Sequence, residues 1–594
     1  MKLKYICMFS ALALMTASCD EDSFLDLKPQ GSLNEDIMTS TEGADLLVNA
    51  AYAALGGAEG QTWSVWCHPT SNWTYGEVRS DNAYKGGGGV GDLNEVHRME
   101  TFDMDATNGF LDSKWYHLYC SVQRCNSALR VLNAATDEQI SGRTSRIAEM
   151  KVLRAHYYFE LSRLFNKIPY FDENVEISQY PNISNNEFTR NEILDKLAQE
   201  MLDAAAQLPT SQPEVGRIHK YIALAYAAKI KLYQAYEQDE TTHAVVSINK
   251  ELLREVVSLC DQVTASNRYG LIDDFQGLDL IANENGKESV FAIQYSMNDG
   301  TESAGRINWS NLLNSPGGGS PYGGDGFFLP SQDLINAYQT DANGLPDFSY
   351  QVKADYSKAV LSNGVYTLEN TNPNVDPRLD FVVGRPNITW KTYTEKPCEG
   401  WVRDKETYGY NCAKRFWVSP ESSDMFKGWP WGASQLNWQI IRYADILLWK
   451  AEALIELNEG DGLDMARGLI NEIRNRAKNS PYVKDFNDNS KYAAHYLINS
   501  YPAEGWNQDY ARKALRWETR LEKALEGERF FDLVRWGIAE NTMNNYIAAE
   551  KDNRIYYGNA QFTKGKDEYY PVPNNQYGFS GGKYVQNPGY PAFN

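Results

Sequence analysis

The chain lacks the short signatures that mark several classes of enzyme and metal protein. Its eight cysteines form no Cys-x-x-Cys pair and its seven histidines no His-Glu-x-x-His pair, so zinc has no recognisable ligand set. No glycine run ends in Gly-Lys-Ser/Thr, which argues against a nucleotide-binding loop. Acidic residues are abundant, but their number alone does not identify the carboxylate pair of a glycoside hydrolase. We therefore predict no catalytic residues, no metal ligands and no cofactor.

Basic residues are also few for a chain of this size. There are 57 Lys and Arg against 78 Asp and Glu, a formal net charge of -21 over 594 residues. Such a surface repels nucleic acid, so nucleic acid is not an expected partner. The length exceeds the usual range of one domain, so we expect two domains or one extended scaffold with long insertions.

Long apolar runs are missing as well. The run at residues 6–15 is too short to span about 30 Å of hydrocarbon, which needs about 20 apolar residues, and no later window supplies one. Lys2 and Lys4 precede this run, and small residues follow it up to Cys19. This pattern is typical of a lipoprotein signal peptide at residues 1–18.

Cys19 is the expected lipidation site. Three acidic residues at 20–22 follow it, which favours export of a lipoprotein to the cell surface, although Thr16 stands where a large aliphatic residue is usual. Ordinary cleavage near Cys19 is the alternative. With acyl chains such as palmitate on Cys19, residues 19–40 would form a lipid anchor and tether that attach the mature chain to a membrane.

Helical periodicity dominates two parts of the chain, residues 41–267 and 438–594. Ala223 and Ala227, four residues apart, let a second helix approach closely, as tetratricopeptide hairpins require. We therefore predict a mainly α fold with a tetratricopeptide-like scaffold of helical hairpins. Apolar residues at three-four spacing predict helices at 42–54, 112–134, 143–166, 190–208, 216–237, 249–265, 442–458, 464–478, 510–526 and 528–536.

Residues 268–437 have a different composition, rich in Gly, Pro, Asn and aromatic residues. A long irregular region inside a compact protein is usually functional or disordered, and the aromatic density argues against disorder. We expect an irregular, loop-rich insertion that carries ligand-binding loops. Cys398 and Cys412 could form a disulfide within it, which the sequence alone does not decide.

Seven short motifs occur in a fixed order along the chain. They are Phe-Leu-Asp-Leu-Lys-Pro at 24–29, Arg-Ala-His-Tyr-Tyr-Phe at 154–159, Arg-Tyr-Ala-Asp-Ile-Leu-Leu at 442–448, Asn-Glu-Ile-Arg-Asn-Arg-Ala at 471–477, Gly-Glu-Arg-Phe-Phe-Asp-Leu-Val-Arg-Trp at 527–536, Tyr-Pro-Val-Pro at 570–573 and Gln-Asn-Pro-Gly-Tyr at 586–590. In this order, behind a lipoprotein signal, they resemble the SusD-like family of outer-membrane glycan-uptake lipoproteins.

The resemblance implies a role in nutrient uptake and polysaccharide utilisation. Such a protein lies on the cell surface, binds oligosaccharides and caps a TonB-dependent, SusC-like outer-membrane transporter. Charged motif residues such as Arg442, Asp445 and Glu452 are expected to hold the scaffold together. A bound structural Ca²⁺ is possible in this family, with Asp325 as a conceivable oxygen ligand, but no spaced acidic loop specifies one.

Sugar binding asks for flat aromatic faces beside polar side chains that meet hydroxyl groups. Two loops offer such residues next to Gly-rich or Asn-rich turns, which we expect to keep the rings exposed, although a loop tryptophan can also be a structural anchor. Trp429 and Trp431 belong to the wider set of aromatic residues in the insertion. The predicted ligand-binding residues are Trp73, Tyr75, Asp81, Asn82, Trp309, Tyr322, Trp390 and Trp417.

Two other functions remain open at this point. An oligopeptide-binding member of the same superfamily would use backbone hydrogen bonds in place of aromatic rings. A surface glycoside hydrolase is less well supported, because nothing in the sequence marks its acid and base. Which glycan or linkage is bound cannot be inferred from loop composition, because stacking on aromatic rings tolerates many sugars.

Overall fold

The computed structural model describes residues 40–57, 65–300, 305–362, 365–397 and 399–593. The predicted signal peptide, Cys19 and the tether before residue 40 lie outside the described residues, as does Cys398 with its proposed disulfide to Cys412. Within the described ranges, no helix has both the length and the apolar character needed to cross a membrane.

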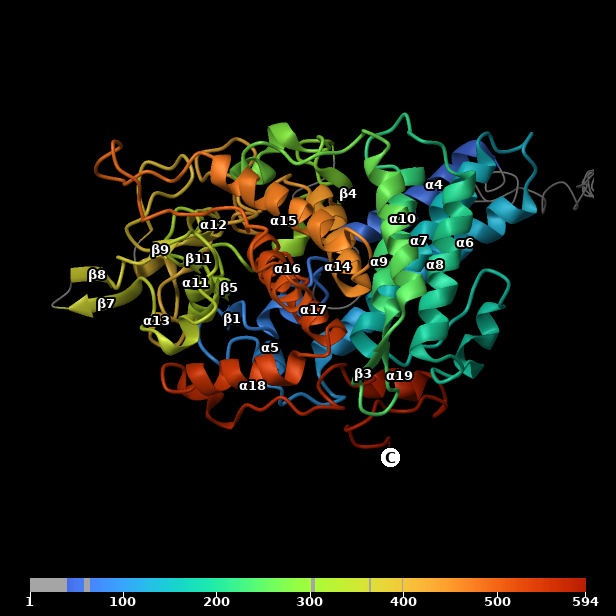
Figure 1. Ribbon diagram of the computed structural model, residues 1–594. Coiled ribbons are helices and arrows are strands. Elements are labelled where there is room, and N and C mark those ends of the chain that lie inside the picture. The colour runs from blue at the N-terminus through green and yellow to red at the C-terminus, as the bar shows by residue number, and fades with distance from the viewer. Residues whose placement is uncertain (1–39, 58–64, 301–304, 363–364, 398, 594) are drawn as a thin grey trace, which may run out of the picture.

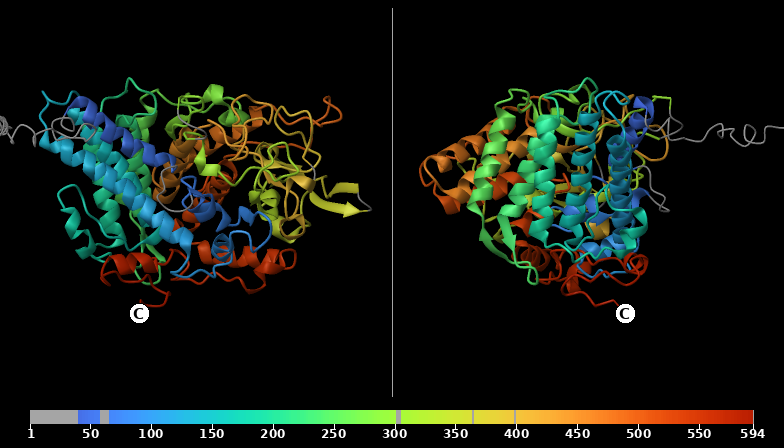
Figure 2. Two further views of the ribbon diagram at one scale, coloured as in Figure 1. Left: turned by 180° about the vertical axis from the view of Figure 1, so that it is seen from behind. Right: turned by 90° about the vertical axis from the view of Figure 1, so that its right-hand side faces the viewer.

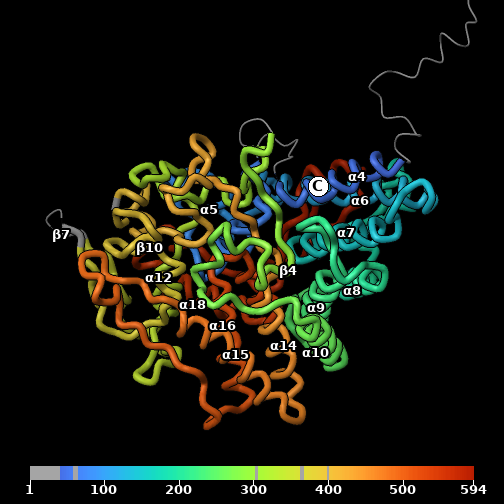
Figure 3. The backbone as a smooth tube through the Cα atoms, turned by 90° about the horizontal axis from the view of Figure 1, so that it is seen from above, coloured from blue at the N-terminus to red at the C-terminus, as the bar shows by residue number. Residues whose placement is uncertain are grey.

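The first helical block forms a curved array in which each helix packs on the next along the chain. Figure 3, viewed from above, shows this arc, and Figure 2 shows the same helices from behind and from the side. The block consists of α4 (Thr41–Ala53), α6 (Gly109–Ala134), α7 (Arg143–Phe165), α8 (Arg190–Gln207), α9 (Lys220–Ala235) and α10 (Lys250–Thr264).

The second block continues the same arc. Helix α10 packs against α14 (Tyr443–Leu457), which in turn contacts α15 (Gly462–Asn479) and α16 (Gln508–Glu522), and α17 (Arg529–Arg535) follows. The two blocks, far apart in the sequence, therefore form one scaffold. The predicted mainly α, tetratricopeptide-like fold is confirmed.

Local sequence explains how these helices begin and pack. Helix α8 begins at a capping box, in which Thr189 and Glu192 each accept a hydrogen bond from the other's backbone N–H. Helix α9 is almost wholly buried, and its Ala223 and Ala227 are fully buried. Because these side chains are small, α9 fits between α8, α10 and α14, as the spacing of the two alanines predicts.

The insertion lies beside the arc, on the left of Figure 1, and consists mostly of loops. Across the described chain, both inside and outside the insertion, the strands pair two by two, always antiparallel. The pairs are β1 (Ala83–Gly86) with β5 (Phe327–Pro330), β2 (Tyr236–Gln238) with β3 (Val245–Ile248), β4 (Ser289–Ile293) with β12 (Trp438–Arg442), β6 (Gln339–Thr340) with β9 (Asn374–Val375), β7 (Lys358–Ser362) with β8 (Val365–Glu369) and β10 (Val383–Gly384) with β11 (Cys412–Ala413).

The pair β4 and β12 joins the start of the insertion to its end, so the insertion leaves and returns to the scaffold at one place. The remaining helices are short, and α18 and α19 run along the bottom of Figure 1 beneath both parts. They are α5 (Asn94–Glu100), α11 (Gln332–Ala337), α12 (Arg378–Val382), α13 (Lys405–Tyr408), α18 (Ala539–Glu550) and α19 (Asn574–Phe579). Single turns of 3₁₀ or π helix lie at η1 (Ala54–Gly56), η2 (Val65–Cys67), η3 (Trp73–Val78), η4 (Ile177–Asn182), η5 (Phe275–Asp279), η6 (Ile281–Asn283), η7 (Trp309–Asn311), η8 (Tyr350–Val352), η9 (Glu399–Trp401) and η10 (Ile555–Asn559).

Buried ion pairs join the insertion to the second block. Arg442 pairs with Glu288 at 2.9 Å and with Glu522 at 2.7 Å, and all three side chains are buried. Burial alone would raise the pKa of Glu522, but the surrounding guanidinium groups outweigh it and lower the pKa to about 2. Asp445 pairs with Lys523 at 2.7 Å, and Glu452 pairs with a buried arginine of α17. The predicted scaffold role of these motif residues is confirmed.

Candidate ligand-binding surface

Trp73 and Tyr75 lie in η3 and are buried. Trp73 is 2% exposed and packs against Phe328, with ring centroids 5.7 Å apart, while the Tyr75 hydroxyl lies 2.8 Å from the carbonyl oxygen of Cys67. Gly76 allows this burial because it lets the loop lie directly against the backbone before α17. A Cβ on Gly76 would lie 1.9 Å from the carbonyl oxygen of Gly527, so a larger residue would not fit. The loop is pressed onto the scaffold, so the expected exposure of these two rings is wrong.

Asp81 and Asn82 are buried as well, and arginines of the second block hold both. Arg529 forms a bidentate pair with Asp81 at 2.8 and 2.9 Å, and Arg520 donates to the Asn82 side-chain oxygen at 2.9 Å. Burial alone would raise the pKa of Asp81, but Arg520 and Arg529 outweigh it and lower the pKa to about 2. The structure gives both residues a role in holding the loop, and the expectation that they face a ligand is wrong.

Tyr322, Trp390 and Trp417 form the buried aromatic core of the insertion. The Tyr322 hydroxyl donates to the Val418 carbonyl at 2.8 Å and accepts from the Trp390 indole N–H at 3.0 Å, and the Tyr322 and Trp417 rings lie 6.2 Å apart. None of the three is more than 3% exposed. Expected exposure is wrong here too, because the glycine run packs closely: a Cβ on Gly319 would lie 2.2 Å from a backbone oxygen.

A group of three tryptophans remains at the surface of the insertion. Trp429 is 50% exposed and Trp431 42% exposed, and they are the exposed tryptophans of the described chain. Trp309 is half-buried, and its ring lies 6.1 Å from that of Trp429 at an angle of 60°. We call Trp309, Trp429 and Trp431 the tryptophan platform, and it includes one of the eight predicted residues.

Hydrogen bonds and a close contact at its base hold the turn that carries Trp429 and Trp431. The Phe426 N–H donates to the Ala433 carbonyl at 2.8 Å and closes the turn. Gly432 has a φ of 74°, and a Cβ there would lie 2.6 Å from the side chain of Ser315. The Ser315 hydroxyl donates to the Trp431 carbonyl at 2.7 Å. The backbone is thus held while both rings project from the tip.

Trp309 begins η7 and is held by Asn308. The Asn308 side chain accepts from the Ser310 N–H at 3.0 Å and donates to the Leu436 carbonyl at 2.8 Å. Half-buried Trp66 lies in η2, which packs against η7. Arg306, with 65% of its side chain exposed, supplies polar groups three residues before Trp309. This combination of flat rings and a charged side chain suits a polyhydroxylated ligand.

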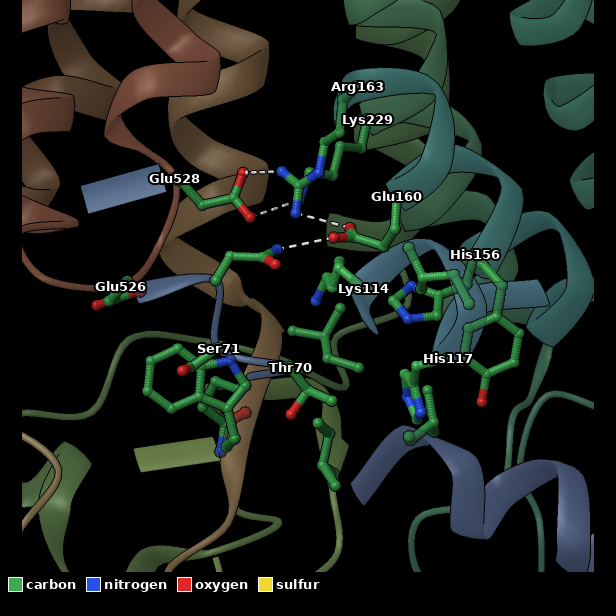
Figure 4. A pocket seen from close by; sticks show the side chains of 18 of the residues that line it. Thr70, Ser71, Lys114, His117, His156, Glu160, Arg163, Lys229, Glu526 and Glu528 are labelled. Atoms are coloured by element: carbon green, nitrogen blue, oxygen red, sulfur yellow. Dashed lines mark hydrogen bonds and ion pairs between the residues drawn. The ribbon is translucent and has the colours of Figure 1, made fainter. Parts of the chain in front are cut away.

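The central pocket in Figure 4 has a different character. It lies between α6, α7, α9 and the start of α17, and its cavity of about 40 Å³ has room for few waters. Arg163 lies between Glu160 at 2.6 Å and Glu528 at 2.7 Å, and Lys229 lies 3.2 Å from Glu528. Burial alone would raise the pKa of Glu160, but Arg163 together with the neighbouring His156, Lys114 and Lys229 outweighs it and lowers the pKa to about 2. These charges satisfy one another and join the two blocks.

No group of three or more His, Cys, Asp or Glu side chains in the described ranges is arranged to hold a metal ion.

The sequence did contain a signal for the exposed tryptophans. Trp429 and Trp431 flank a proline inside Lys-Gly-Trp-Pro-Trp-Gly at 427–432, where two rings in a short turn leave little room for both to be buried.

Family models match both parts of the chain. A model described as SusD family matches residues 287–590, and one described as starch-binding associating with outer membrane matches residues 23–232.

Individual relatives are similar over nearly the full length. SusD-like protein P2 of Formosa agariphila is 24% identical, over 99% of this chain and 100% of the relative. A laminarin-binding SusD-like protein of known structure superposes with a TM-score of 0.63 at 21% identity, over 93% of this chain and 100% of that one. Surface glycan-binding protein A from Bacteroides thetaiotaomicron in complex with laminarihexaose gives a TM-score of 0.62 at 19% identity, over 92% and 99%. At these identities, the two structures establish the fold.

Proposed function

The chain belongs to the SusD family, and from that premise we propose that it captures oligosaccharides at the tryptophan platform and delivers them to a TonB-dependent outer-membrane transporter. The observation that carries this proposal is the exposure of Trp429 and Trp431 beside Trp309 on a turn whose backbone is fixed. Exposed rings cost hydration free energy unless a partner covers them, and the apolar face of a pyranose ring is such a partner.

The platform favours capture and release over tight retention. Each aromatic contact contributes about 0.5 to 1.5 kcal/mol beyond burial, so three rings hold a single sugar chain only weakly. A polysaccharide with many repeats rebinds before it diffuses away, which raises its apparent affinity. Arg306 would meet hydroxyl groups at the edge of the rings, which selects among sugars of similar shape.

The proposal includes attachment of the protein to the cell surface through a lipid anchor. Cys19 would carry the lipid anchor in the outer membrane, and the acidic run after it supports export to the surface. The description of one matching family model, starch-binding associating with outer membrane, supports the same location. Laminarin, which a structural relative binds, is a sensible first polysaccharide to test.

Affinity gels with a panel of polysaccharides test the proposal. Wild-type protein should be retarded by at least one glycan, and Trp309→Ala and Trp429→Ala should each reduce the retardation markedly. Phe579→Ala is the matched control, because it removes an aromatic ring that is 74% exposed elsewhere on the surface. Peptide capture predicts binding of peptides with no effect of either tryptophan variant, and hydrolysis predicts shortened products. Either of these results would contradict the proposal.

A further inference from the structure

A groove of about 390 Å³ lies between the loop before α9 and strand β4, and its size is in the range of about 300 to 1,000 Å³ that is typical of ligand sites. Four consecutive residues of β4, 289–292, line it. Successive side chains of a strand point to opposite faces, so contact with consecutive residues places the groove along one edge of β4. Because β4 pairs with β12 and with no other strand of the described chain, this edge is open to a further strand.

The floor of the groove is apolar. Ile222, Val290 and Phe291 line it and are at most 4% exposed, whereas Val215, which also lines it, is 69% exposed. An open strand edge beside apolar side chains suits an extended peptide, because the peptide backbone pairs with the edge and its alternate side chains enter the groove.

The charged side chains that line the groove are Arg217, Arg268, Lys287 and Glu214. Arg217 pairs with Glu214 and with carboxylates of α4 and α7. Lys287 pairs with Asp273 at 3.0 Å, but the Asp273 side chain is 99% exposed, so another carboxylate can readily replace this contact. Arg268 is exposed and forms no ion pair within the described ranges. In a chain of net charge -21, the groove therefore offers two basic side chains to an acidic partner.

The N-terminal part of the chain lies beside this groove. Asp45, the fifth residue of α4, lies 3.9 Å from Arg217, and the Tyr52 hydroxyl accepts from the Ile218 N–H at 2.9 Å. Helix α4 therefore runs along the loop that forms one wall of the groove. Ten residues, 30–39, separate the motif at 24–29 from the start of the described chain and can span at most about 35 Å, so the motif can reach the groove.

The tether before α4 has matching chemistry. Residues 20–39 contain six acidic residues and one lysine, and three of the acidic residues stand at 20–22. The sequence Leu-Asp-Leu-Lys at 25–28 alternates apolar and polar side chains with the period of a strand, and the proline that follows cannot continue the pairing. One of the matching family models begins at residue 23 and continues through this motif into the first helical block.

We propose that residues 24–28 of the tether lie in this groove as an added strand beside β4. Leu25 and Leu27 share one face of such a strand and would contact the apolar floor. The acidic run at 20–22 would lie beside Arg268 and Lys287, and its carboxylates would pair with them. This docking rests neither on the tryptophan platform nor on lipidation.

Docking of the tether would also orient the protein on the membrane. With acyl chains on Cys19, only residues 20–23 would separate the lipid from the groove, which is at most about 14 Å of extended chain. The side of the protein that carries β4 and the loop before α9 would therefore be held close to the membrane surface.

Hydrogen–deuterium exchange followed by mass spectrometry tests the docking. The sample is the mature chain from residue 20 onward, prepared without lipid, and the reference is a synthetic peptide of residues 20–39. Amides of residues 24–28 should exchange at least about tenfold more slowly in the protein than in the peptide, because pairing with β4 protects them.

Two pairs of substitutions locate the contact. Leu25→Asp with Leu27→Asp should remove the protection, because charged side chains do not enter an apolar floor. Arg268→Glu with Lys287→Glu should reduce the protection at least about threefold, because attraction of the acidic run becomes repulsion at both positions.

The matched control is Lys358→Glu with Lys551→Glu. It makes the same change in net charge at two exposed lysines that do not line the groove, and it should leave the protection unchanged. Photo-crosslinking then identifies the contact directly. A benzoylphenylalanine in place of Phe24 should crosslink within one chain to residues 215–222, 268–269 or 285–294.

Four results would overturn the proposal. One is exchange of residues 24–28 as fast as in the peptide, and another is protection that reversal of Arg268 and Lys287 leaves unaltered. A third is crosslinking between two chains, which would assign the groove to a second copy. The fourth is capture of added peptides of unrelated sequence while residues 24–28 exchange freely, which would make the groove a peptide-binding site.

Discussion

Two aromatic loops with neighbouring glycines have similar composition and opposite environments. Trp73, three residues before Gly76, is 2% exposed, whereas Trp429 and Trp431, on either side of a proline before Gly432, are 50% and 42% exposed. Both glycines let the backbone approach another segment closely. In the first loop this contact presses the rings into the scaffold. In the second it fixes the base of a turn whose tip carries the rings. Glycine therefore marks close packing of the backbone, and the shape of the turn decides whether a neighbouring ring is exposed.

The largest expected effect is on the buried side of this comparison. Trp73→Ala should lower the free energy of unfolding by about 3 to 5 kcal/mol, because it leaves a cavity against Phe327 and Phe328. Denaturant unfolding measures this change. Any loss of glycan binding should follow the loss of folded protein. A Trp73→Ala protein of wild-type stability that no longer binds would reverse the roles of the two loops.

Acid should weaken the buried loop before it affects the platform. The pKa of Asp81 is about 2 in the folded protein, below its ordinary value near 4, so its ion pairs stabilise the fold fully above about pH 4. This contribution, about 2 kcal/mol, is lost as the pH falls from 4 to 2. Unfolding free energies measured at several pH values should therefore fall more steeply for the wild type than for Asp81→Asn. Equal slopes would show that Asp81 is not held by Arg520 and Arg529.

Trp429→Ala should change binding and leave stability unaltered. Removal of one ring of the platform should weaken glycan binding by about 1 to 2 kcal/mol, a factor of roughly 5 to 30. Titration calorimetry gives this factor with the glycan that affinity gels identify, and denaturation should show a change within about 0.5 kcal/mol. A marked loss of stability would mean that the ring is a structural anchor.

The smallest expected effect is that of Arg306→Gln. This exposed side chain lies 3.5 Å from Asp299 and is well solvated, so its loss should weaken binding by less than about 1 kcal/mol and leave stability unchanged. Affinities for several sugars should change unequally, because the Arg306 side chain can hydrogen-bond some arrangements of sugar hydroxyl groups better than others. Equal small losses for all sugars would assign the residue a general electrostatic role.

The sequence predicts the scaffold well and the binding surface poorly, for a physical reason. Helix periodicity is local, so the predicted helix at 143–166 agrees with α7, Arg143–Phe165. Burial of a loop ring depends on segments far away in the chain, such as the arginines of α16 and α17 that hold Asp81. The composition of the loop around Trp73 gives no information about those distant partners, so the burial of its rings could not be predicted from it. Trp309 is half-buried and contacts Trp429, which the return of the insertion brings to it, and its role in ligand binding stays a prediction.

Oxidation of tryptophans by N-bromosuccinimide, followed residue by residue with mass spectrometry, tests the central claim most directly. In the free protein, Trp429 and Trp431 should react first, while Trp73, Trp390 and Trp417 should stay intact until the protein unfolds. Addition of a polysaccharide that affinity gels retain should protect Trp429 and Trp431. Early reaction of Trp73, or saturation with glycan that leaves Trp429 and Trp431 fully reactive, would contradict the assignment of the tryptophan platform as the glycan site.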